Sequence, residues 1–171
     1  MVWFWYFSIY SFAGFLLEVA YARLTGGRPD RKGFLLLPLC PVYGLGACAI
    51  LLLPGWIQEN ILLLFLVGGG LASWAEYLAA LFYESALGVS FWDYRGMPGN
   101  VQGRVCLSFS LIWGGLAVVL THVLHPLIAP LPASIPFPVT WTFIAAFWAD
   151  TLVSCLLLRK TGNRDCLKWY A

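Results

Sequence analysis

The chain has 171 residues, of which 61% are hydrophobic and only 11% are charged. Soluble domains usually carry about 25% charged residues, so this composition excludes an ordinary soluble domain and indicates a protein that crosses a membrane several times. The net charge of +2 gives no support for nucleic-acid binding.

Five apolar segments are each long enough to cross a bilayer, at about 20 residues per crossing. They cover residues 2–22, 34–53, 61–82, 105–124 and 137–158. The chain begins with an aromatic cluster over residues 3–7 that lacks the basic residues of a cleavable signal peptide and suits the membrane surface. The sequence therefore predicts an all-α fold, a polytopic membrane helix bundle of about five transmembrane helices, within a single transmembrane domain over residues 1–171.

Basic residues predict how these segments are oriented. All ten fall in the first link, the third link or the C-terminal tail over residues 159–171, and five crossings put these three regions on one side. They are Arg23, Arg28, Arg31, Lys32, Arg95, Arg104, Arg159, Lys160, Arg164 and Lys168. Because cytoplasmic loops are enriched in Lys and Arg, we expect the N-terminus outside and the C-terminus in the cytoplasm, in a plasma (inner) membrane.

An internal repeat relates residues 7–56 to residues 65–125, with the fifth helix over 137–158 outside it. The spacing from Gly33 to Tyr43-Gly44 recurs from Gly103 to Trp113-Gly114, and Glu18 falls opposite Glu76. Two spans per copy predict a parallel repeat, related by an axis along the membrane normal. We then expect both glutamates at a similar depth, facing a shared cytoplasmic half-cavity.

Three carboxylates fall inside the predicted spans. Such groups are costly in a membrane unless they pair, take up a proton or face water, so Glu18 and Glu76 are candidates for a functional site. The equally weighted alternative is a structural ion pair with a loop arginine such as Arg104 or Arg31. For Asp150 we favour a polar contact that fixes helix packing.

A polar stretch over residues 92–104 interrupts the apolar sequence, and its backbone needs either water or packed protein around it. Asp93 and Asn100 offer acceptors, and the planar Arg104 guanidinium suits a carboxylate or a phosphate. Alternatively these side chains hold a re-entrant or interfacial loop, with Trp92 and Tyr94 as anchors at the membrane surface.

For electrostatic reasons we expect this polar stretch and the two glutamates to form one site. Arg104 begins the fourth segment, one to two turns from the depth of Glu18 and Glu76, so we expect it to pair with one of them. The predicted ligand-binding set is Glu18, Glu76, Trp92, Asp93, Tyr94, Asn100 and Arg104.

No motif points to a metal or a cofactor. The five cysteines form no C-x-x-C pair and read as small buried apolar residues. His122 and His125 lack partners at metal-site spacing. No G-x-x-x-x-G-K-[ST] sequence occurs, so the chain cannot hydrolyse ATP by itself. We predict no metal and no cofactor, and any ATPase would be a separate subunit.

Several of these residues also match one family pattern. The matching strings are Tyr10-Ser11-Phe12-Ala13-Gly14, Glu18, Arg31-Lys32-Gly33-Phe34-Leu35, Pro38, Pro41-Val42-Tyr43-Gly44, Glu76, Trp92-Asp93-Tyr94, Asn100, Gly103-Arg104-Val105-Cys106-Leu107 and Trp113-Gly114. The chain resembles the "Putative ABC-transporter type IV" (CmpB-like) integral-membrane family, which includes the vertebrate transmembrane protein 229 group. The family often has Asn-Arg where this chain has Arg31-Lys32, so no role for that amide carries over.

The resemblance implies a multi-pass membrane protein with a transport-like function. Our first hypothesis is a permease-like protein that binds or moves a small polar or amphiphilic solute through a cytoplasm-facing polar cleft. The alternatives are an intramembrane enzyme acting on a lipid headgroup, with Arg104 holding a phosphate, or a structural assembly protein. The expected partners are the lipid bilayer and either a separate ATP-binding subunit or further copies of the chain, without nucleic acid.

Overall fold

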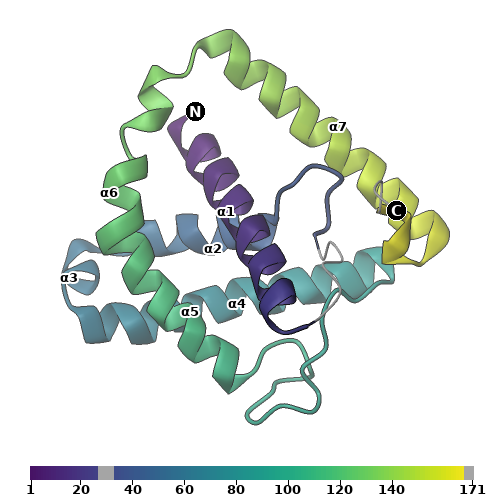
Figure 1. Ribbon diagram of the computed structural model, residues 1–171, viewed down its shortest axis with the longest axis horizontal. Helices are drawn as coiled ribbons and strands as arrows, with labels where there is room; N and C mark the ends of the chain where they lie inside the picture. Colours follow the sequence, from purple (N-terminus) through teal and green to yellow (C-terminus); the bar gives the residue numbers. More distant parts are fainter. Residues whose placement is uncertain (27–32, 168–171) are drawn as a thin grey trace.

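The computed structural model describes residues 1–26 and 33–167, and within these ranges the fold is all-α, as predicted (Figure 1). The only β pairing there is an isolated bridge between Val101 and Val105. The helices are α1 (Val2–Leu24), α2 (Pro41–Leu51), α3 (Gly55–Gln58), α4 (Ile61–Leu87), α5 (Leu107–Val119), α6 (His125–Ile128) and α7 (Phe137–Thr161). Single turns occupy Leu120–Leu124, Leu131–Ser134 and Arg164–Leu167. Arg28, Arg31, Lys32 and Lys168, which entered the orientation and family arguments, lie outside the described residues.

Four helical segments of the described chain are long and apolar enough to cross a membrane. They are Val2–Leu24, Ile61–Leu87, Leu107–Ser134 and Phe137–Thr161, with 23 to 28 residues each. At 1.5 Å per residue each exceeds the roughly 30 Å hydrocarbon core of a bilayer. These four correspond to the first, third, fourth and fifth predicted segments, so the predicted helix bundle is confirmed.

The second predicted segment, residues 34–53, differs from the expected continuous helix. Its helix, α2, has only 11 residues and begins at Pro41. The backbone before it is non-helical, and Cys40 has the extended dihedral angles φ −112° and ψ 91°. The physical reason is Pro38 and Pro41, because a proline disfavours the helical conformation of the residue before it and is accepted only in a first helical turn.

Asp150 on α7 holds this non-helical segment in place. Its two carboxylate oxygens accept hydrogen bonds from the backbone N–H groups of Leu36, at 3.0 Å, and Leu37, at 2.8 Å. Leu35 is fully buried beside them. Non-helical backbone at membrane depth must be satisfied by protein, so Asp150 has the structural role favoured from the sequence.

The helices pack in two pairs, α1 against α2 and α4 against α5, and α2 also packs against α4. Glycines allow the close approach within each pair. A Cβ atom added to Gly44 of α2 would collide with the carbonyl oxygen of Phe7, and one added to Gly114 of α5 would lie 2.7 Å from that of Phe65. Small residues at helix interfaces serve the same purpose in many membrane proteins.

Helix α7 runs along one edge of the molecule (Figure 1). Near its start, Phe143 and Phe147 meet Phe4 of α1, with ring centroids 6.0 and 6.1 Å apart. Near its end, Leu158 is fully buried in a cluster with Phe34 and Tyr83. Helix α7 is thereby anchored at both ends.

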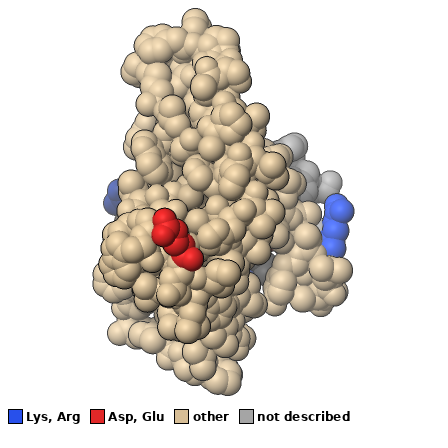
Figure 2. All heavy atoms as spheres, turned by 90° about the vertical axis from the view of Figure 1, so that its left-hand side faces the viewer, with Lys and Arg blue, Asp and Glu red and all other residues tan. Residues whose placement is uncertain are grey.

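Much of the outer surface carries large hydrophobic side chains, as expected of a lipid-facing surface. Figure 2 shows the face that is on the left in Figure 1, where Asp, Glu, Lys and Arg occupy only a small part of the area. Large hydrophobic side chains stand exposed on several helices, among them Leu62, which is 68% exposed, and Leu127, which is 70% exposed. Surfaces of this kind and extent occur where a protein contacts a membrane or a partner.

Candidate functional site

The candidate site is a cleft of about 750 Å³ between the two helix pairs. Its walls come from α1, from the segment before α2 and the start of α2, from α4 and α5, from the loop that joins α4 to α5, and from Arg164 after α7. Of the seven predicted site residues, five line it: Glu18, Glu76, Trp92, Asp93 and Tyr94. The other two, Asn100 and Arg104, are not among its lining residues.

Glu18 enters the cleft from the C-terminal half of α1. The hydroxyl of Tyr43, in the first turn of α2, donates a hydrogen bond of 2.7 Å to its carboxylate. Gly14, one turn earlier on α1, lies so close to the Tyr43 side chain that a Cβ atom would collide with it. The small residue at position 14 thus lets the phenol reach Glu18.

Glu76 lies in the middle of α4 and is only 4% exposed. Two neutral donors hold its two oxygens, the hydroxyl of Tyr94 and the indole N–H of Trp113, each at 2.9 Å. The Trp113 ring also contacts the Tyr43 ring edge to face, with centroids 5.0 Å apart. Glu18 and Glu76 are therefore held by two aromatic donors that touch each other.

Tyr94 carries the loop into the site. Its ring stacks on Phe109 of α5 at 4.9 Å, and its hydroxyl points to Glu76. Burial and the neighbouring Glu76 carboxylate raise the pKa of Tyr94 well above its usual value, so the phenol stays protonated and remains a donor.

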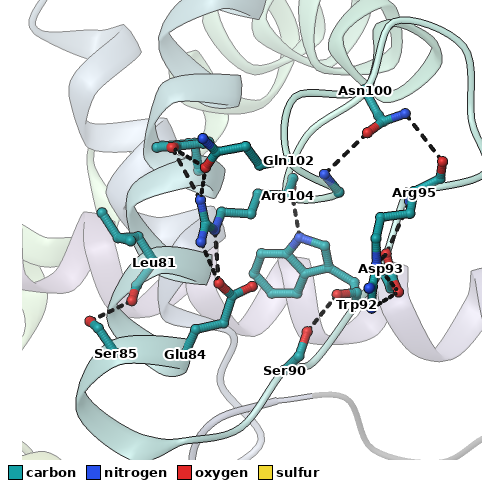
Figure 3. Close-up of polar contacts among 12 residues, drawn as sticks. Leu81, Glu84, Ser85, Ser90, Trp92, Asp93, Arg95, Asn100, Gln102 and Arg104 are labelled. Atoms are coloured by element: carbon teal, nitrogen blue, oxygen red, sulfur yellow. Dashed lines mark hydrogen bonds and ion pairs between the residues drawn. The ribbon is translucent and has the colours of Figure 1, made fainter.

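Asp93 and Arg95 form an exposed pair at the edge of the cleft (Figure 3). Their closest approach is 2.7 Å, and hydrogen bonds from Arg95 lower the pKa of the Asp93 carboxyl. With side chains 48% and 80% exposed, the two charges neutralise each other in contact with solvent. Such surface pairs contribute little to stability.

Arg104 does not pair with Glu18 or Glu76, which corrects the sequence-based expectation. Its guanidinium binds Glu84 through two nitrogens, at 2.9 and 2.6 Å (Figure 3). It also donates to Tyr77 at 3.2 Å and to Gln102. The hydrogen bonds that Arg104 donates to Glu84 and Tyr77 raise the pKa of Arg104, so it stays charged. A guanidinium bound in this way leaves little support for a phosphate-binding role.

The loop itself is closed by Asn100 and Trp92. The Asn100 amide group donates to the carbonyl of Met97 at 2.9 Å. Its oxygen accepts from the N–H of Gly103 at 3.2 Å (Figure 3). The Trp92 indole N–H donates to the backbone carbonyl of Arg104 at 2.8 Å. Gly103 has φ +74°, and a side chain there would press on Arg95. These contacts fix the loop shape that brings Tyr94 into the cleft.

Sequence reasoning missed the two donors Tyr43 and Trp113 and the Arg104 partner Glu84. A signal for the donors existed, because the repeat aligns Tyr43 with Trp113 and Glu18 with Glu76. Within the described residues, no group of three or more His, Cys, Asp or Glu side chains is arranged to hold a metal ion.

The apolar spans around this cleft define an integral, multi-pass membrane protein of transporter-like character. A family model described as "Putative ABC-transporter type IV" matches residues 5–156, and the chain belongs to this family. The family expected from the sequence motifs is thereby confirmed. Neither the curated proteins nor the solved structures that we compared with the chain gave a match.

Proposed function

We propose that the protein is a permease-like membrane subunit that binds or moves a small polar or amphiphilic solute through a cytoplasm-facing polar cleft. The observation that carries this proposal is the 750 Å³ cleft between membrane-spanning helices, with Glu18 and Glu76 in its wall. Ligand pockets commonly have volumes of about 300–1,000 Å³ and combine apolar walls with a few placed polar groups. The cost of keeping carboxylates at this depth favours a role in binding.

The proposed ligand-binding residues are Glu18, Glu76, Trp92, Asp93 and Tyr94. Asn100 and Arg104 then act indirectly, because their contacts hold the loop that presents Tyr94. The chain carries no ATP-binding motif, so a separate ATP-binding subunit or an ion gradient would supply the energy.

We also propose that residues 7–56 and 65–125 are two copies of one structural unit, each contributing one carboxylate to the cleft. Three contacts within the first copy support this, because the residues aligned with them in the second copy also contact each other. The matched contacts are Glu18–Tyr43 with Glu76–Trp113, Phe7–Gly44 with Phe65–Gly114, and Ser11–Cys40 with Gly69–Ser110.

Access to the cleft from water is the first test. Ile112 and Leu111 are neighbours on α5 and are both 51% exposed, but only Ile112 lines the cleft. We expect Ile112→Cys to react with a charged, membrane-impermeant thiosulfonate in inside-out vesicles, above the background of the native cysteines. Leu111→Cys, facing lipid, is the matched control. Equal labelling of the two variants, or labelling of Ile112→Cys only from the outside, would contradict the proposal.

Solute movement is the second test. The full chain, with any ATP-binding subunit that co-purifies, is reconstituted into liposomes loaded with a panel of cationic, neutral and anionic solutes. We expect at least one solute to cross faster than in empty liposomes, and Glu76→Gln to abolish that difference. If every solute crosses at the rate of empty liposomes with and without an ATPase, the protein is not a permease.

A further inference from the structure

Some of the charged side chains that line the cleft have no partner of opposite charge among the described residues. Its acidic and basic lining residues are Glu18, Glu76, Asp93, Arg95 and Arg164. Asp93 and Arg95 neutralise each other at 2.7 Å, and Arg164 donates to the carbonyl of Phe91 at 2.8 Å. Within the described residues, the ion pairs between side chains are those of Asp93 with Arg95 and Glu84 with Arg104. Glu18 and Glu76 therefore face the cleft without a described Lys or Arg partner.

The donors that hold these two glutamates orient them but carry no charge. Tyr43 donates to Glu18, and Tyr94 and Trp113 donate to Glu76. Two carboxylates in one low-dielectric cavity attract a positive charge much more strongly than they would in water. Among the described residues, the site is thus arranged to attract a cation.

Aromatic rings surround the same space. Tyr43 and Trp113 contact each other edge to face at an interplanar angle of 73°, so their faces are turned in different directions. Tyr21 of α1 and Tyr94 of the loop both contact Phe109, with centroids 6.1 and 4.9 Å away. Faces of Trp and Tyr rings attract cations, and aromatic cages of this composition bind quaternary ammonium groups.

The size and chemistry of the cleft favour an organic cation over a metal ion. Calcium takes about six to eight oxygen ligands, and Mg²⁺ needs near-octahedral oxygen geometry. The described residues contain no group of three or more carboxylate, thiol or imidazole side chains that could hold such an ion. A cleft of about 750 Å³ with many aromatic and aliphatic lining residues has room for alkyl substituents on a charged nitrogen.

We propose that the cleft recognises an organic cation, a quaternary or protonated amine, with its charge between Glu18 and Glu76 and its alkyl groups against the surrounding rings. This inference rests on the proposed function, because it names the chemical class of the solute that the cleft takes.

Three probes of nearly the same shape separate charge from size. They are choline, its neutral carbon analogue 3,3-dimethylbutan-1-ol, and the anion 3,3-dimethylbutanoate. Binding to the purified full chain in detergent is measured by calorimetry at constant ionic strength. We expect choline to bind at least about tenfold more tightly than the neutral analogue, and the anion to bind most weakly.

Two variants locate the site. Glu18→Gln and Glu76→Gln keep the shape of the side chain and remove its charge, and each is expected to weaken choline binding at least about tenfold. Glu59→Gln is the matched control, because Glu59 is an exposed carboxylate outside the cleft. Variants are compared only when they elute as single species with wild-type helix content. The comparison of the three probes on the wild-type chain needs no variant.

The outcomes distinguish this inference from the proposed function. If the neutral or the anionic probe binds as tightly as choline and competes at the cleft, the charge selectivity is wrong and the proposed function stands. Displacement of choline by equimolar Na⁺ would also overturn the organic cation. If no probe binds at millimolar concentration and the vesicle test shows a closed cleft, both proposals fail.

Discussion

Replacing Glu76 with glutamine and, separately, with leucine tests how much its two hydrogen bonds contribute to stability. Both changes remove the charge, so the cost of holding a carboxylate inside the membrane cancels in the comparison. A glutamine oxygen can still accept from the Trp113 indole, and its NH₂ group can donate to the Tyr94 hydroxyl. Leucine can do neither. At about 0.5–1.5 kcal/mol net per hydrogen bond, Glu76→Leu should be less stable than Glu76→Gln by about 1–3 kcal/mol.

The measurement is the free energy of unfolding of each purified variant in detergent, from a reversible denaturant titration. The control is the same pair of changes at Glu59, which is exposed, where we expect a loss of no more than about 0.5 kcal/mol. If Glu76→Leu is as stable as Glu76→Gln, the two aromatic donors do not depend on this carboxylate and the assignment of the site's geometry is refuted.

Two further predictions concern residues that hold the elements around the site. Arg104→Met should lower stability, because it leaves Glu84 without its ion-pair partner. Adding Glu84→Gln should restore part of the loss, whereas adding Glu76→Gln should not. The same denaturant titration measures both effects, and the reverse pattern would contradict the ion pair seen in Figure 3. Asp150→Ala should remove the two hydrogen bonds that Asp150 accepts from backbone amides of the non-helical segment, cost about 1–3 kcal/mol and speed hydrogen exchange between residues 33 and 40. Asp150→Asn, which keeps one acceptor, should show a smaller effect in both measurements, and equal effects would count against this role.

The helix bundle could be read from the sequence because its signal is local. A run of about 20 apolar residues needs no tertiary information to predict a crossing, and four of five segments appear as long helices. The chain's polar side chains could likewise be singled out because they are few. Five of the seven predicted site residues lie around one cleft, and their role in binding a ligand stays a prediction.

The carboxylate that pairs with Arg104 could not be predicted, because it depends on where α4 ends and the sequence indicates helix ends poorly. We expected the third segment to stop at residue 82, but α4 continues to Leu87 and ends at Gly88, whose φ is +69°. This extension keeps Glu84 on the helix, two turns beyond Glu76 and opposite Arg104. A helical turn advances only 5.4 Å, so a shift of a few residues in the boundary changes which carboxylate the arginine meets.

Because the second helix is short, its length alone does not show that residues 34–53 cross the membrane. The positions of the basic residues provide a second argument. Eleven helical residues span about 16 Å, about half of the roughly 30 Å core, and the non-helical residues 33–40 precede them. Contacts of this segment step toward the start of α1, from Ser11 beside Cys40 to Trp3 beside Cys48.

If this segment crosses, all ten Lys and Arg residues lie on one side; if it does not, four remain on one side and six move to the other. The positive-inside rule favours the first arrangement strongly. We therefore expect reporters inserted after Gly26 and fused after Ala171 to read cytoplasmic, and one inserted after Gln58 to read outside. Because only a crossing between residues 26 and 58 can put the first and third reporters on opposite sides, matching readings from these two would refute it.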